Sequence, residues 1–280
     1  MGVVKGTEIP TIDVALVTIQ TYEVGADELV FDTANQIQVE VQTETTDRIP
    51  LIVKGRLIAQ KPQETTVTGN NITLTDNVFN PELVKILQGG TIKYDSVDTT
   101  KVIGYTPPVT GSKDKGKLFK LRAYSAIYNS AGIITGYERI TYPNCQGNPV
   151  AFGAEDGTFR APEYTISSAP ANNEAPYDID IVADLPQVLG SLSVASVAGS
   201  TSGTTKITVS PLKGADNSYM YKTGATVDLP NYGDDLSATY TAWDGTSDIT
   251  ATDGNKIVIA EVDASNKAVK GGITTVVSAT

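Results

Sequence analysis

The sequence contains no histidine, one cysteine and one tryptophan among its 280 residues. Without histidine, a Ser-His-Asp triad, a Cys-His pair and a histidine-ligated zinc site are all impossible. With Cys145 alone, no disulfide can form within the chain. A thiol nucleophile also needs a neighbouring base, so we interpret Cys145 as a small buried apolar residue. These absences predict that the protein is not an enzyme and binds no cofactor.

A pair of catalytic carboxylates is an arrangement that the composition still allows. The chain has 32 acidic residues, but nothing in their spacing singles out two of them. Three acidic loops, at Asp95, Glu155 and Asp244, have the residue types of a calcium site. None matches the twelve-residue loop with its closing glutamate, so we interpret them as solvated turns and predict no metal ligands.

Long apolar runs and dense clusters of basic residues are also missing. No window approaches the length of a membrane span, and the first residues contain no apolar run of signal-peptide length. The net charge of −11 argues against affinity for DNA through its phosphates. We therefore expect a protein that is made in the cytoplasm and has no membrane contact.

Strand patterns are what the sequence does contain. Ile37, Val39 and Val41 alternate with polar residues, which predicts a strand with one dry and one wet face. The polar stretch 43–50 is expected to be a projecting hairpin loop, and Gly69 to Asn71 a tight hairpin turn. The wet face of the first strand holds Gln38, Glu40, Gln42 and Glu44.

One short helix is predicted between Asn80 and Gly90. Asn80 can cap the free N–H groups of its first turn, and Pro81 suits the first helical position. Gly89 can adopt the left-handed conformation that ends a helix. At about two turns the helix is too short to be stable alone, so it must pack on a sheet. Its apolar side consists of Leu83, Val84, Ile86 and Leu87.

A change of composition near residue 188 predicts two domains, 1–188 and 189–280. The second has short strands separated by turn residues, the pattern of an immunoglobulin-like sandwich, with Trp243 in its core. Residues 191–197 are a linker or, as their period of two favours, its first strand. The predicted fold class is mainly β: a β-sandwich or barrel with one short packed helix, followed by an immunoglobulin-like β-sandwich.

Residues 54–90, 117–150 and 155–170 together resemble the major tail protein, or tail tube protein, of tailed bacteriophages. The short helix between two strand regions is the most telling part of this resemblance, which covers about the first 186 residues. The C-terminal segment resembles the immunoglobulin-like modules that are often appended to phage tail and capsid proteins.

The resemblance implies a structural subunit of a phage tail, located in the virion. Subunits of that family form six-membered rings that stack into a tube, and DNA passes through its lumen during ejection. The implied partners are further copies of the chain and the tape measure, tail-tip and terminator proteins. The resemblance implies lumen-facing residues at Gln38, Glu40, Gln42 and Glu44, although an ordinary solvated face explains them equally well. It implies ring-stacking residues at Thr45, Thr46, Asp47 and Arg48.

The alternative function is a two-domain β-sandwich binding module that recognises carbohydrate or a cell surface. This function requires an exposed aromatic platform, for which the single tryptophan is poor support. On a bacterial surface it also requires an export signal, which the sequence does not show. An exposed excursion over residues 95–117 is expected, with no role assigned to it.

Overall fold

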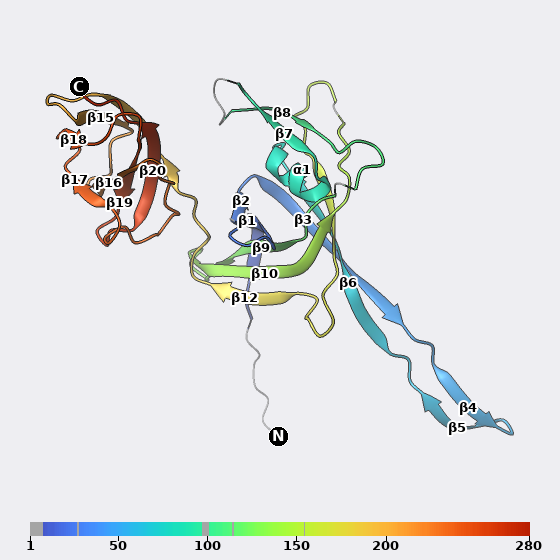
Figure 1. The fold of residues 1–280 in the computed structure, drawn as a ribbon. Coiled ribbons are helices and arrows are strands. Elements are labelled where there is room, and N and C mark those ends of the chain that lie inside the picture. Colours follow the sequence, from blue (N-terminus) through green and yellow to red (C-terminus); the bar gives the residue numbers. More distant parts are fainter. Residues whose placement is uncertain (1–7, 27, 97–100, 114, 154) are drawn as a thin grey trace. The chain divides into compact units, whose positions relative to one another are not determined.

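The computed structural model describes residues 8–26, 28–96, 101–113, 115–153 and 155–280 (Figure 1). The chain divides into two compact units, Met1–Leu185 (unit 1) and Pro186–Thr280 (unit 2). The boundary expected from the sequence lies a few residues further along, between 188 and 189. The predicted fold class is confirmed, because the described residues form strands in several sheets and one short α-helix.

Unit 1 is built on an eight-stranded sheet in which all neighbouring strands are antiparallel. The strand order is β2-β1-β9-β10-β11-β6-β3, and β12 pairs with β10 outside this path. The strands are β1 (Thr11–Thr21), β2 (Glu28–Phe31), β3 (Ala34–Thr45), β6 (Thr65–Asp76), β9 (Phe119–Tyr128), β10 (Ile134–Gly147), β11 (Glu163–Ser168) and β12 (Asp178–Val182). Two separate ribbons are formed by β4 (Ile49–Val53) with β5 (Arg56–Lys61), and by β7 (Thr91–Tyr94) with β8 (Val102–Thr106).

Helix α1 (Pro81–Gln88) covers one face of this sheet (Figure 1). Asn80 caps it, since its side-chain oxygen accepts a hydrogen bond from the Leu83 N–H at 3.1 Å. Gly89 ends it at a φ of 84°, and its N–H donates to the Lys85 carbonyl. The buried helical residues join the main core of unit 1 together with residues of β1, β6, β9 and β11. They are Leu83, Val84, Ile86 and Leu87.

The pairing register gives the sheet one apolar and one polar face. Directly paired residues share a face, so Val17 and Ala123 point into the core while the neighbouring pair of Thr18 and Arg122 lies on the other side. Along β3, Ile37 pairs with Leu74 on the core side. The polar face therefore continues across the sheet as far as β3.

Two sequence predictions about turns are wrong. Gly69 to Asn71 form no turn, because β6 runs through them and pairs with β3 along its length. A Cβ at Gly69 would lie 2.4 Å from the Ser168 carbonyl oxygen, so glycine permits a close backbone approach there. Residues 43–50 form no loop either, because β3 continues to Thr45 and β4 begins at Ile49. The turn lies at Lys54 and Gly55, both with positive φ.

Unit 2 is a β-sandwich. A five-stranded sheet has the order β13-β20-β19-β16-β17 and a three-stranded sheet the order β14-β15-β18. The strands are β13 (Gly190–Ser191), β14 (Ser193–Ala198), β15 (Thr204–Ser210), β16 (Ser218–Gly224), β17 (Thr241–Trp243), β18 (Ile249–Thr250), β19 (Lys256–Val262) and β20 (Ala268–Thr275). Trp243 lies in the core, and its indole N–H donates to the Ser247 carbonyl at 2.8 Å. Residues 191–197 are largely strand, which excludes the linker interpretation.

Leu83→Ala tests the packing of the helix on the sheet. Truncation of a fully buried leucine leaves a cavity, so we expect the free energy of unfolding to fall by about 2–5 kcal/mol. Lys85→Ala, on the exposed side of the same helix, should change it by less than about 0.5 kcal/mol. Urea denaturation followed by circular dichroism measures both. Equal midpoints for the two variants would contradict the described packing.

Candidate functional site

Catalytic and metal-binding groups are the first candidates, and the described residues offer little for either. No group of three or more metal-ligating side chains comes together among them. The Asp244 carboxylate accepts hydrogen bonds from the Thr246 and Ser247 N–H groups at 2.8 and 2.7 Å, so it stabilises its own turn. The hydrogen bond from the Ser247 hydroxyl lowers the pKa of Asp244 most, and the two backbone N–H bonds lower it further. Of the acidic stretch that begins at Asp95, residues 97 and 98 lie outside the described residues.

Cys145 is fully buried beneath the sheet, where its Sγ donates to the Tyr142 carbonyl at 3.3 Å. Burial raises the pKa of the thiol to about 12, although hydrogen bonds involving Leu121 and Ser168 lower it in part. The thiolate is therefore disfavoured at neutral pH. The side chain acts as an apolar core residue.

Glu261 is a fully buried acidic residue of unit 2. Its carboxylate contacts the Lys270 ammonium at 2.7 Å, the Asn217 amide at 2.6 Å and the Gly214 N–H at 2.9 Å. Burial by itself raises the pKa of Glu261, but these three partners outweigh it and lower the pKa below its ordinary value. With all three partners inside the unit, the carboxylate is a structural group.

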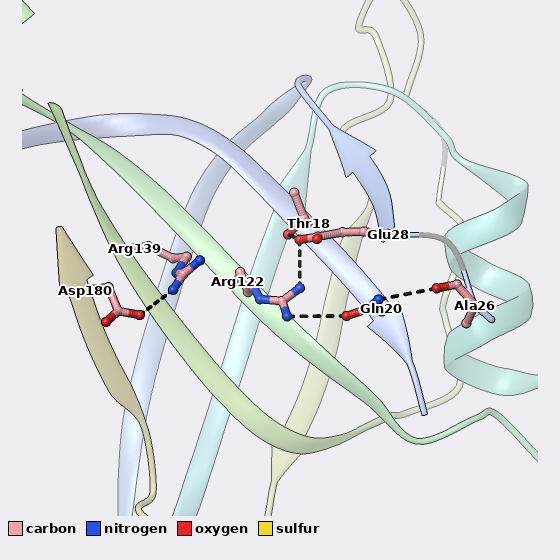
Figure 2. A network of polar contacts seen from close by, with 7 residues as sticks. All are labelled: Thr18, Gln20, Ala26, Glu28, Arg122, Arg139 and Asp180. Carbon is pink, nitrogen blue, oxygen red and sulfur yellow. Dashed lines mark hydrogen bonds and ion pairs between the residues drawn. The ribbon is translucent and has the colours of Figure 1, made fainter. Parts of the chain in front are cut away.

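A network of charged side chains lies on the polar face of the unit 1 sheet (Figure 2). The Arg122 guanidinium contacts Glu28 at 2.8 Å and the Gln20 side-chain oxygen at 3.3 Å, and Thr18 also donates to Glu28. These contacts connect β2, β1 and β9. On β10, Arg139 forms an ion pair with Asp180 of β12 at 2.5 Å, which raises the pKa of Arg139. Each of these contacts connects neighbouring strands of the sheet.

The sequence-predicted residues of β3 extend the same polar face. Gln38 pairs with Thr73, and Glu40 with Asn71. The four residues Gln38, Glu40, Gln42 and Glu44 are exposed except for Gln42, which is half-buried. The group Thr45, Thr46, Asp47 and Arg48 is exposed and lies within a ribbon, where the Thr46 N–H donates to the Glu64 carbonyl at 2.8 Å. The functional roles given to both groups stay predictions.

The most unusual surface is a ribbon that we call the arm, residues 43–68. It consists of β4 and β5 with the adjoining ends of β3 and β6 (Figure 1), and every one of its residues is exposed. Six large aliphatic side chains of β4 and β5 are each 47–63% exposed. These are Ile49, Leu51, Ile52, Val53, Leu57 and Ile58. Large exposed apolar areas are uncommon on monomeric soluble proteins and are typical of interaction sites.

The outer part of the arm, residues 48–61, is basic, whereas the chain as a whole is acidic. Residues 48–61 contain Arg48, Lys54, Arg56 and Lys61 and no acidic residue, although the net charge of the protein is −11. The chain outside residues 48–61 therefore has a more negative net charge than the protein as a whole. No role was predicted for these apolar residues from the sequence. The signal that was missed is the combination of basic and apolar residues over 48–61, with no acidic residue among them.

A second candidate surface is an exposed aromatic cluster formed by Phe79, Phe152, Phe159 and Arg160. The rings of Phe79 and Phe152 meet edge to face with centroids 5.5 Å apart, and the Arg160 guanidinium lies 5.7 Å from the Phe152 centroid. Phe159 is 98% exposed and lines a cleft of about 460 Å³. The other two phenylalanines of the chain, Phe31 and Phe119, are buried in the core.

The described residues thus form a mainly β protein with two exposed surfaces, the arm and the aromatic cluster. The family model of the S-layer protein SbsC C-terminal domain matches residues 197–278, which lie in unit 2. A similar solved structure is the crystal structure of the S-layer protein SbsC, domains 7, 8 and 9, at 16% identity. The similarity covers 75% of this chain and 70% of that chain, at a TM-score of 0.29, which is too low to support an argument. Among curated proteins, none matches.

The prediction of a phage tail tube subunit is overturned by this family match. The C-terminal segment, for which the resemblance implied a module of phage tails, matches the family model of an S-layer protein domain. The predicted virion location, hexameric rings, DNA passage and tail partners are wrong on the same ground. The resemblance depended on a capped helix between hairpins, a pattern that follows from sheet packing in general and carries no function-specific side chain.

Glu261→Gln tests the role of the buried carboxylate. The folded-state pKa of Glu261 lies below the unfolded value of about 4.3, so its contribution to stability is present above that pH and is lost as the pH falls. We expect unit 2 to lose more stability in the wild type than in Glu261→Gln between pH 6 and pH 3. Urea denaturation followed by Trp243 fluorescence reports on this unit.

Asp216→Asn, at an exposed position of the same unit, is the control for that experiment. It should reproduce the pH dependence of the wild type. An identical pH dependence in all three proteins would contradict the assigned role of Glu261.

Proposed function

We propose that this protein is a non-catalytic structural subunit that associates with copies of itself in a layer at a bacterial cell surface. The observation that carries the proposal is the arm, whose aliphatic side chains are left exposed by the described residues of unit 1. A two-stranded ribbon is at best marginally stable in water, so contact with another molecule would stabilise it. The match of residues 197–278 to the S-layer domain supports the proposed class of assembly.

The chemistry of the chain supports a role without catalysis. Histidine is missing from the sequence, the Cys145 thiol is buried and the Glu261 carboxylate is held by three partners. The charged network on the polar face connects strands of one sheet. No helix in the described part of the chain has the length and apolarity to cross a membrane.

An arm deletion tests the proposal. Thr46 and Glu64 face each other across the ribbon, so residues 47–63 can be replaced by an Asn-Gly turn that closes the hairpin there. We expect the full chain to form large assemblies at high concentration, and the shortened chain to stay monomeric with unchanged secondary structure. Light scattering and negative-stain electron microscopy measure the difference.

Two substitutions separate the apolar surface from the length of the arm. Leu51→Ser with Leu57→Ser should weaken assembly, whereas Val109→Ser, another exposed aliphatic residue of unit 1, should not. A wild-type chain that stays monomeric at high concentration would contradict the proposal. So would assembly that survives the arm deletion.

The second candidate function is recognition of a surface carbohydrate by the aromatic cluster. Exposed rings that flank a cleft with charged side chains are the arrangement that stacks on sugar rings, and Glu155, Arg160 and Glu163 line this cleft. Sedimentation with purified bacterial cell-wall polysaccharide tests it. Phe159→Ala should abolish co-sedimentation while the arm-dependent assembly persists, and no binding by the wild type would exclude this candidate.

A further inference from the structure

Two open strand edges in unit 1 have complementary side chains, one in the arm and one at the rim of the sheet. We propose that β5 of one copy pairs edge to edge with β12 of a second copy. The inference rests on the proposed self-association and names the two surfaces that meet. Unpaired strand edges are templates for further pairing, and such strand addition is a common mode of recognition.

The arm has two edges, and its sequence favours the one formed by β5. Pro50 lies in β4, and proline lacks the N–H group that a further strand would need. No proline lies within β5, whose partner among the described residues is β4 alone. Both faces of the ribbon are apolar. Leu57 pairs with Ile52 on one face, and Ala59 pairs with Leu51, the neighbour of Ile52 in β4, on the other. A partner sheet can therefore cover either face.

The acceptor edge is β12. It pairs with β10 on one side, and the described residues provide no partner on its other side (Figure 1). Its side chains Ile179 and Ile181 are 49% and 53% exposed, although they extend the core face of the sheet. The ion pair of Asp180 with Arg139 fixes the strand to β10. The edge is thus held in position while its apolar residues stay uncovered.

The charges of the two strands match at both ends. Strand β5 begins with Arg56 and ends with Lys61, with the apolar residues between them. The acceptor begins with Asp178, and Asp184 follows two residues after its end. None of these four side chains forms an ion pair within the described chain. Each strand therefore presents an apolar centre between unpaired charges of one sign, and the signs are opposite.

The pairing gives the same central contact for either strand direction. With Arg56 opposite Asp178 in a parallel pair, or opposite Asp184 in an antiparallel pair, Ala59 lies opposite Ile181. In both arrangements Lys61 lies one position along the strand from the second acidic residue, and the two side chains point to opposite faces. The competing edge is β3, but Gln38 and Glu40 make it more polar, and it also contacts β1.

Reversal of the charges tests the pairing in the full-length protein. In one variant Arg56 and Lys61 become Glu, and in the other Asp178 and Asp184 become Lys. Each variant alone brings like charges together, so we expect its assembly to require at least roughly tenfold more protein than the wild type. An equimolar mixture should assemble like the wild type, because every arm then meets an edge of opposite charge.

The outcomes separate the pairing from the proposed function. The pairing would be overturned if the mixture did not assemble although both variants had the circular dichroism of the wild type. It would also be overturned if each variant alone assembled like the wild type. In both cases wild-type assembly leaves the proposed function standing. A wild type that never assembles overturns both. Lys113→Glu with Lys115→Glu makes the same charge change at an exposed loop and should leave assembly unchanged.

Cysteine cross-linking locates the contact directly, because Cys145 is buried. The chain with Ala59→Cys and Ile181→Cys should form reducible multimers on oxidation, since paired strands bring side chains within disulfide distance. The matched chain with Ala59→Cys and Val41→Cys places the second cysteine on β3. Multimers from the β3 chain, and none from the β12 chain, would overturn the pairing.

Discussion

The contact between α1 and the sheet is the interaction on which unit 1 depends. The sheet has one polar face, so its stability requires that the other face be covered. An eight-residue helix provides part of that cover, because its caps are satisfied and four of its side chains enter the core. Gly147 of β10 makes this possible, since a Cβ there would lie 2.5 Å from Leu87.

This arrangement explains why the arm differs from the rest of the unit. The apolar residues of β1, β6, β9 and β11 share one core with the helix, whereas β4 and β5 lie beyond it. No other described element of unit 1 covers the two apolar faces of this ribbon, so its side chains stay exposed. The same residue types that stabilise the sheet by packing become, in the arm, a surface that is available for contact.

The sequence predicts local features well when their causes are local. The helix was predictable because Asn80, Pro81 and Gly89 each act within one turn, and the alternation over Ile37 to Val41 identified β3. The turn predicted at Gly69 to Asn71 was wrong, because glycine suits a tight turn and also permits a close approach of the β6 backbone to β11. The extent of the arm was unpredictable, since alternation identifies a strand but does not show whether anything covers it.

A donor strand and an acceptor edge at different places on one chain have a consequence for symmetry. The contact between them is heterologous, so each copy that is added leaves one free arm and one free edge. Such a contact closes into a ring of two or more copies or extends as a filament, depending on the rotation that relates one copy to the next. A two-dimensional layer then needs a second, independent contact between rows, and the arm alone sets the growth in one direction.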